Sequence, residues 1–272
     1  MHLKLRHTTR YTYDTPVRSV IQVLRVTPRG HGTQHILNWH IDTDHDATLK
    51  RSEDSFGNIV HTFWAEGPMD ELVITVEGEA ITEDASGVLS GTAERLPLGL
   101  FLRETGLTTP DAAIRDFARK AAGEQNTLDS LHALMDALSE HMTFEKKVTD
   151  PATTSKEAFE KAHGVCQDYA HVFIAAARSL EIPARYVGGY MYQPGEQTIH
   201  EAGHGWAEAF VSGLGWVGFD AANNMCPNDA YIRVACGLDY LDAGPVRGVR
   251  SGVAEETLDV EVELTDMGAD KA

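Results

Sequence analysis

The chain has 272 residues, 42% of them hydrophobic and 24% charged, so it can bury the core of one large domain or two smaller ones. Its 41 acidic residues against 23 lysines and arginines give a formal net charge of −18, which argues against nucleic acid and acidic membranes as partners. Three cysteines are too few for a disulfide framework, no apolar run is long enough to cross a bilayer, and the first residues lack the apolar stretch of a secretory signal. We therefore expect a cytoplasmic protein with reduced thiols.

The first part of the chain has the pattern of β-strands. Apolar and polar residues alternate over 37–41, 60–64 and 72–76, as expected when one face of a sheet is buried. Turn-forming pairs that contain glycine precede the last two of these segments. We expect an antiparallel β domain over residues 1–85.

The pattern changes after a stretch rich in Ser, Gly and Thr, which predicts a linker over residues 86–108. Helical periodicity with capping residues then predicts three helices and a fourth that begins near Cys166. Strand patterns return afterwards, over 185–192, 205–211, 216–220 and the tail from 253. The fold class expected is α+β, with residues 109–272 forming a core of helices on an antiparallel sheet together with C-terminal strands.

Cys166 is the strongest candidate for a nucleophile. It follows Gly164-Val165 and begins a helix whose apolar face includes Tyr169 and Phe173. The unpaired N–H groups and the positive dipole end of a helix N-terminus favour a thiolate, which is the nucleophilic form of cysteine. Cys226 and Cys236 lack such a setting, and we expect them to be packing residues.

A nucleophile needs a base, and the base needs a group that orients it. His204 begins one predicted strand and Asp220 ends the next, with a Ser212–Gly215 turn between the two strands. Neighbouring antiparallel strands can place the two side chains together, so that Asp220 accepts a hydrogen bond from one ring nitrogen while the other nitrogen faces the sulfur of Cys166.

Four motifs in this order resemble the bacterial transglutaminase-like proteins, relatives of the papain-type cysteine proteases. They are GVCQDYA at 164–170, IPARYVGGY at 182–190, HGWAE at 204–208 and GWVGFD at 215–220. The strand-rich front, with HTTRYTY at 7–13, resembles the N-terminal region that accompanies this core in bacteria.

The resemblance implies that Cys166 is the nucleophile, His204 the general base and acid, and Asp220 the orienting carboxylate. The backbone N–H of Cys166 is expected to stabilise the oxyanion, and Gln167 is a possible second donor. The chain departs from the family at Gly205, where alanine usually follows the histidine, and at Ala221, where proline often follows the aspartate.

These residues predict acyl transfer on a peptide or isopeptide amide through a thioester, without a cofactor or a metal. Hydrolysis is favoured over the cross-linking of protein glutamines by a transglutaminase, because no site that would orient a second amine is evident. The expected partner is a peptide or protein substrate. Trp206 and Tyr190 are candidate residues of the substrate cleft, whereas the physiological substrate and the oligomeric state do not follow from the sequence.

Two other classes remain open at this point. Residues 200–204 spell H-E-x-x-H, the pattern of zinc metallopeptidases, which requires both histidines on one face of a helix. The two glycines that flank His204 disfavour a helix there. A non-catalytic peptide-binding module is the other class, although such a module would not need all three of Cys166, His204 and Asp220.

Overall fold

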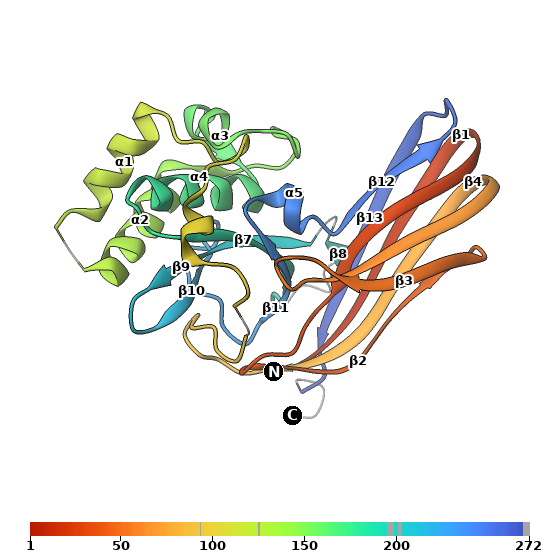
Figure 1. Cartoon of the computed structure of the whole chain (residues 1–272), viewed down its shortest axis with the longest axis horizontal. Helices are drawn as coiled ribbons and strands as arrows, with labels where there is room; N and C mark the ends of the chain where they lie inside the picture. Colours follow the sequence, from red (N-terminus) through yellow and green to blue (C-terminus); the bar gives the residue numbers. More distant parts are fainter. Residues whose placement is uncertain (93, 125, 195–198, 201–202, 269–272) are drawn as a thin grey trace.

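The computed structural model describes residues 1–92, 94–124, 126–194, 199–200 and 203–268. It contains two main antiparallel sheets, and helices cover one face of the smaller sheet (Figure 1). The architecture is α+β, as the sequence predicts: a strand-rich front part followed by helices packed on an antiparallel sheet.

The larger sheet is built on two long strands, β1 (His2–Thr27) and β4 (Ile59–Thr82). Strands β2 (Gln34–Thr43) and β3 (Ala47–Glu53) both pair with β4. Over the described residues the strand order is β2-β4-β1-β13-β8, with β8 at Ile199–His200. Inward-facing residues of β1, such as Leu3 and Leu5, alternate with exposed ones and are completely buried.

Two details of this sheet differ from the sequence prediction. Residues 59–82 form one continuous strand instead of two, with irregular pairing to β1 around Val17. In the first half of this strand Phe63 and Ala65 face the core, whereas Trp64 is 44% exposed. Because side chains alternate between the two faces of a strand, burying Phe63 turns Trp64 towards solvent.

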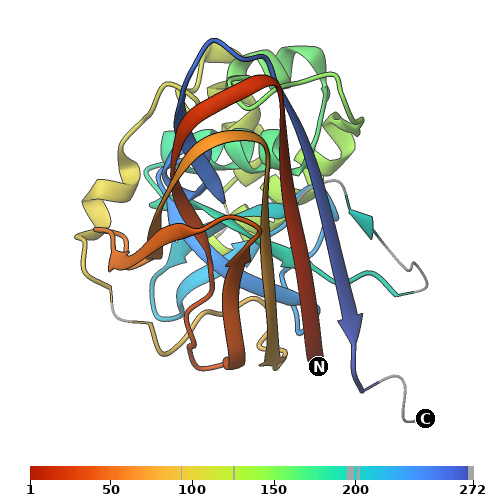
Figure 2. The same cartoon turned by 90° about the vertical axis from the view of Figure 1, so that its right-hand side faces the viewer.

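The last two strands belong to the larger sheet. β12 (Val246–Ser251) and β13 (Glu256–Asp266) both pair with β1, and Figure 2 shows the end of the chain running beside its beginning. From the sequence, these strands are expected together with the core of residues 109–272. The alternating pattern identified a strand but not its partner, and β1, with 26 residues, is long enough to pair with both strands one after the other.

The smaller sheet has the order β10-β9-β7-β11. Its strands are β7 (Ala184–Met191), β9 (His204–Val211), β10 (Gly215–Phe219) and β11 (Tyr231–Gly237). Two short parallel strands, β5 (Thr143–Phe144) and β6 (His163–Gly164), pair separately. Phe173 and Phe219 stack with ring centroids 5.2 Å apart and join the helices to this sheet.

Four helices begin close to the expected positions: α1 (Ala112–Ala122), α2 (Thr127–His141), α3 (Ser155–Lys161) and α4 (Cys166–Ser179). The structure adds two short helices that the sequence does not predict, η1 (Leu98–Leu102) within the expected linker and α5 (Tyr240–Ala243). Asp111 caps α1 by accepting a hydrogen bond from the N–H of Ile114. None of the helices in the described ranges is long and apolar enough to span a membrane.

Two amide side chains fasten the larger sheet to the smaller one. Gln34 and Asn58 each donate to a carbonyl and accept from an N–H of β11, on Arg233 and Cys236 respectively, over 2.7–2.8 Å. Each amide thus bonds to the backbone as a neighbouring strand would. β11 lies at the edge of its sheet, so these contacts satisfy an otherwise open edge and fix the two sheets against each other.

Candidate active site

The start of helix α4 is fixed by a buried carboxylate. Asp168 accepts a hydrogen bond from the N–H of Val165 over 2.8 Å and another from the hydroxyl of Thr149 over 2.7 Å. Gly164 makes this turn possible, because a Cβ at this position would lie 2.6 Å from a carboxylate oxygen of Asp168. Cys166 is therefore held as the first residue of a 14-residue helix, at its positive dipole end.

His204 and Asp220 come from the antiparallel pair β9 and β10. Phe219 pairs with Ala207, so Asp220 follows β10 at the end where β9 begins with His204. Nε2 of His204 lies 2.6 Å from Oδ2 of Asp220. The hairpin thus places the two residues side by side, in the arrangement that the spacing predicts.

The electrostatics of the site favour a protonated imidazole. Burial alone would lower the pKa of His204, but the charges of Asp220 and Cys166 and hydrogen bonds to both raise it to about 10. Burial likewise opposes ionisation of Asp220, yet the positive charge of His204 and three side-chain hydrogen bonds hold the pKa of Asp220 below its ordinary value. With Nε2 bonded to Asp220, Nδ1 is the nitrogen of His204 left for the thiol.

Asp220 accepts more hydrogen bonds than the sequence predicts. Its Oδ2 also accepts hydrogen bonds from the hydroxyl of Tyr231 and from Nδ2 of Asn223, each over 2.8 Å, and its Oδ1 accepts from the N–H of Ala222 over 3.2 Å. The sequence contains a signal for Asn223, because an Asn three positions after an aspartate is typical of a turn in which the two side chains lie close together. Tyr231 comes from β11, beyond the hairpin, and has no comparable signal.

A cavity of about 270 Å³ opens beside the sulfur, and Cys166, Gln167, Tyr190 and His204 are among the residues that line it. The side chain of Gln167 donates to the carbonyl of Pro151 over 3.4 Å. Tyr190, a predicted cleft residue, therefore lies in the same cavity as the cysteine and the histidine.

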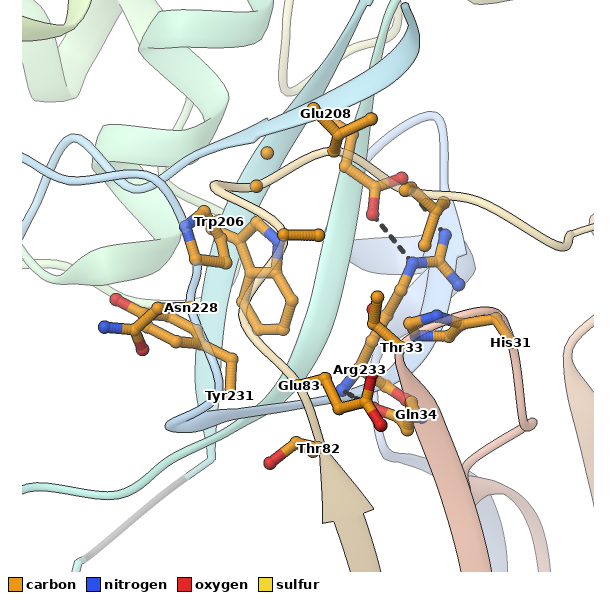
Figure 3. Close-up of a pocket in the computed structure, with 16 residues that line it drawn as sticks. His31, Thr33, Gln34, Thr82, Glu83, Trp206, Glu208, Asn228, Tyr231 and Arg233 are labelled. Atoms are coloured by element: carbon orange, nitrogen blue, oxygen red, sulfur yellow. Dashed lines mark hydrogen bonds and ion pairs between the residues drawn. The ribbon is translucent and has the colours of Figure 1, made fainter. Parts of the chain in front are cut away.

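Trp206, the other predicted cleft residue, is buried and packs on the ring of His204. It is 3% exposed, stacks on the ring of His204 with centroids 6.0 Å apart, and meets Tyr231 edge to face. Trp206 lines a separate, smaller cavity of about 60 Å³. Figure 3 shows it there together with Tyr231, Glu208 and Arg233. Trp206 thus packs on the imidazole and is not among the residues that line the cavity with Cys166.

Gly205, where the family usually has alanine, faces Tyr186. A Cβ on Gly205 would overlap the hydroxyl of Tyr186 and lie 2.8 Å from its Cζ. Tyr186 also lines the cavity that contains Cys166. The hydroxyl of Tyr186 thus occupies the space that the methyl group of an alanine at position 205 would need, next to His204.

The pattern for a zinc metallopeptidase is not accompanied by the helix that it needs. His200 lies in β8 and His204 begins β9, whereas Glu201 lies outside the described residues. Across the described ranges, no group of three His, Cys, Asp or Glu side chains is placed to hold a metal ion. The two histidines therefore lack the one-face helical placement that the pattern requires.

Comparison with known families agrees with this fold. Residues 3–80 match the bacterial transglutaminase-like N-terminal region, and residues 115–221 match the transglutaminase-like superfamily. The chain thus combines the two regions that characterise the bacterial transglutaminase-like proteins, and the resemblance carried by the four motifs is confirmed.

Particular relatives match over almost the whole chain. An uncharacterized protein of Mycobacterium leprae is 27% identical over 97% of this chain and 98% of its own length. An uncharacterized protein of Mycobacterium tuberculosis is 28% identical over 98% of this chain and 93% of its own. Among solved structures, a candidate cysteine protease from Cytophaga hutchinsonii shares the fold with a TM-score of 0.76 and 21% identity, over 98% of this chain and 92% of that one.

Proposed function

We propose that this protein transfers acyl groups from peptide or isopeptide amides through a thioester on Cys166, and that water is the usual acceptor. The observation that carries the proposal is the Nε2–Oδ2 contact of 2.6 Å, which aligns His204 on a buried carboxylate while its other nitrogen remains for the sulfur. The cysteine-based fold of the family supports the same chemistry.

In the first half of the reaction, the Cys166 thiolate attacks the amide carbonyl and forms a tetrahedral intermediate. His204, protonated at neutral pH, gives its Nδ1 proton to the leaving amine as the C–N bond breaks. The acyl group is then bonded to sulfur. Asp220 keeps the imidazole oriented through Nε2 and balances its positive charge.

In the second half, His204 removes a proton from water while the oxygen attacks the thioester. The C–S bond breaks, the carboxylic acid leaves, and the thiolate is restored with the imidazolium. We assign the first oxyanion hydrogen bond to the N–H of Cys166, because the first N–H groups of a helix have no partner within the helix. Gln167 stays the proposed second donor; its amide would have to leave the carbonyl of Pro151 to act.

The acceptor distinguishes a hydrolase from a cross-linking transglutaminase. Both would use the same three residues, and an amine competes with water only where a site orients it. Hydrolysis is therefore our proposal, with a peptide or protein as the substrate.

The three cysteines are free thiols, which supports the cytoplasmic location expected from the sequence.

The test is mass spectrometry of the intact protein after mixing with a library of peptide amides. We expect an added acyl mass on Cys166 that disappears with time and is absent in Cys166→Ser. Cys226→Ser is the matched control and should still form the adduct, because this thiol is not placed at the helix start. Absence of any adduct with the wild-type protein would contradict the proposal.

The same samples decide the acceptor. With a primary amine added, a hydrolase should still release the free acid, whereas a transglutaminase should release the amide of the added amine. Predominant amide product at millimolar amine would replace hydrolysis by transamidation in our proposal.

A further inference from the structure

The cavity beside Cys166 is enclosed by both sheets. From the smaller sheet it is lined by Tyr186 and Tyr190 of β7 and by Val234 of β11, and from the larger sheet by His7 and Arg25 of β1. Its volume of about 270 Å³ far exceeds the roughly 10–15 Å³ that a single water needs. It therefore has room for a side chain of a bound peptide.

The β1 part of this wall is held in place. Nδ1 of His7 and the hydroxyl of Tyr190 are hydrogen-bonded over 2.8 Å, and Nε2 of His7 bonds the hydroxyl of Thr9 over 3.1 Å. His7 is 3% exposed and Tyr190 is 4% exposed. The larger sheet is further fixed by Gln34 and Asn58, so the wall is part of the folded structure before any ligand arrives.

The part of the wall formed by His7, Tyr186, Tyr190 and Val234 is uncharged at neutral pH. Burial lowers the pKa of His7 to about 4 and raises the pKa values of Tyr186 and Tyr190 above their ordinary range. The Arg25 guanidinium is paired with Asp54, with Nε to Oδ2 at 3.1 Å. The exposed Asp150 at the rim is bonded to the N–H of Ala152 over 2.8 Å.

A charged side chain placed against His7, the two tyrosine rings and Val234 would lose its hydration without meeting a group of opposite charge on that part of the wall, which is costly. An apolar side chain would gain from leaving water against tyrosine rings and Val234. We propose that the cavity is the pocket for the side chain on the acyl side of the cleaved bond, that it selects uncharged hydrophobic residues, and that strand β1 supplies part of this selectivity. This inference rests on the proposed function.

The first experiment measures kcat/KM for a series of peptide amides that differ in one residue on the acyl side of the bond. Leu and Phe should exceed Lys and Glu by at least about tenfold, the scale on which apolar pockets discriminate. Equal rates for all classes, or a preference for Lys or Glu, would overturn the pocket and leave the thioester proposal intact. No acyl-enzyme with any peptide would overturn both.

Changes in pocket volume give a second measurement. Val234→Ala should shift the preference from Leu towards Phe, and Val234→Phe should shift it towards Ala, each by several-fold in the ratio of kcat/KM values. Val249→Ala and Val249→Phe are matched controls, because Val249 lies on β12 and is 71% exposed. Ratios of kcat/KM that change equally in the Val234 variants and the Val249 variants would contradict the assignment of this cavity as the side-chain pocket.

The contribution of β1 is tested by His7→Ala, which removes a ring from the wall. We expect the preference to extend to larger aromatic side chains, with Trp gaining several-fold relative to Leu. His2→Ala is the control on the same strand, since His2 bonds Glu79 outside the cavity over 2.9 Å. An unchanged Trp-to-Leu ratio of kcat/KM in a folded His7→Ala protein would contradict a role of β1 in selectivity. If His7→Ala does not fold, the two Val234 variants still test the pocket.

Discussion

The hydroxyl of Tyr231 lies 2.8 Å from Oδ2 of Asp220, the same oxygen that accepts the hydrogen bond from Nε2 of His204. Tyr231 also packs edge to face on Trp206, which stacks on His204. The tyrosine thus acts on the histidine by two routes, one polar and one through ring packing. It also contacts the ring of His204 directly, with centroids 5.8 Å apart, and is a positioning residue because it acts through His204 and Asp220.

We expect Tyr231→Phe to lower kcat by about tenfold or more, because it removes one hydrogen bond to a charged group, worth about 1.5–3 kcal/mol, and leaves the ring packing in place. Loss of this bond should raise the pKa of Asp220, so the acidic limb of the kcat profile should move to higher pH. The measurement is the pH dependence of kcat. Tyr13→Phe is the control, as this buried hydroxyl lies in the larger sheet and has no partner within the described residues.

Gly205→Ala is expected to displace the hydroxyl of Tyr186 and to lower kcat/KM several-fold, while the protein remains folded. A tyrosine side chain can shift at its far end, so the effect should be on the cavity and not on the fold. Tyr186→Phe removes the overlapping atom. The double variant should therefore be more active than the product of the single effects predicts, and strict additivity would contradict the proposed steric coupling.

Much of the site follows from local sequence. Gly164 and the helical pattern place Cys166 at the start of α4, and a hairpin of 17 residues places His204 beside Asp220. Both relationships depend on neighbours along the chain, which is why motif spacing is sufficient to predict them.

The rest depends on contacts between distant strands. His7 reaches the cavity only because β1 docks against β7. Tyr231 reaches Asp220 although their strands, β11 and β10, lie at opposite edges of the smaller sheet. Alternation shows which residues share a face of a strand but not what covers that face. For the same reason the sequence predicts Trp206 in the cleft, whereas in the structure Trp206 is packed between the rings of Tyr231 and His204.

Glu208→Gln should destabilise the fold by about 3–5 kcal/mol, the usual cost of breaking a buried ion pair. Glu208 is 2% exposed and bonds Nε of Arg185 over 2.6 Å and Nε of Arg233 over 2.7 Å. Denaturant unfolding measures the change. Glu79→Gln is the control, because its partially exposed pair with His2 should contribute only about 0–1 kcal/mol.

The pH dependence of the same network has a definite sign. Burial opposes the charge of Glu208, but Arg233 and Arg185 lower its pKa to about 2. A depressed carboxyl pKa stabilises the fold above the unfolded value near 4.5, and this contribution is lost as the pH falls towards 2. The difference in stability between wild type and Glu208→Gln should therefore shrink over this range, and a constant difference would contradict the assignment.

His171 should make the protein sensitive to mild acid. Its Nε2 accepts the N–H of Tyr240 over 3.1 Å, which requires a neutral ring, and burial lowers its pKa to about 4. The unfolded chain takes up a proton near pH 6.5, whereas the folded protein does not until about pH 4. Stability should therefore fall as the pH drops from 6.5 to 4, at up to about 1.4 kcal/mol per pH unit for this group.

The variant His171→Gln keeps an uncharged acceptor and cannot titrate, so unfolding free energies measured between pH 6.5 and 4 should show a shallower slope. His40→Gln, at an exposed position of β2, controls for the loss of a histidine elsewhere. His7 and His31 have pKa values lowered to about 4 in the same way, so part of the slope should remain. An identical slope in His171→Gln and wild type would show that this ring is not kept neutral by the fold.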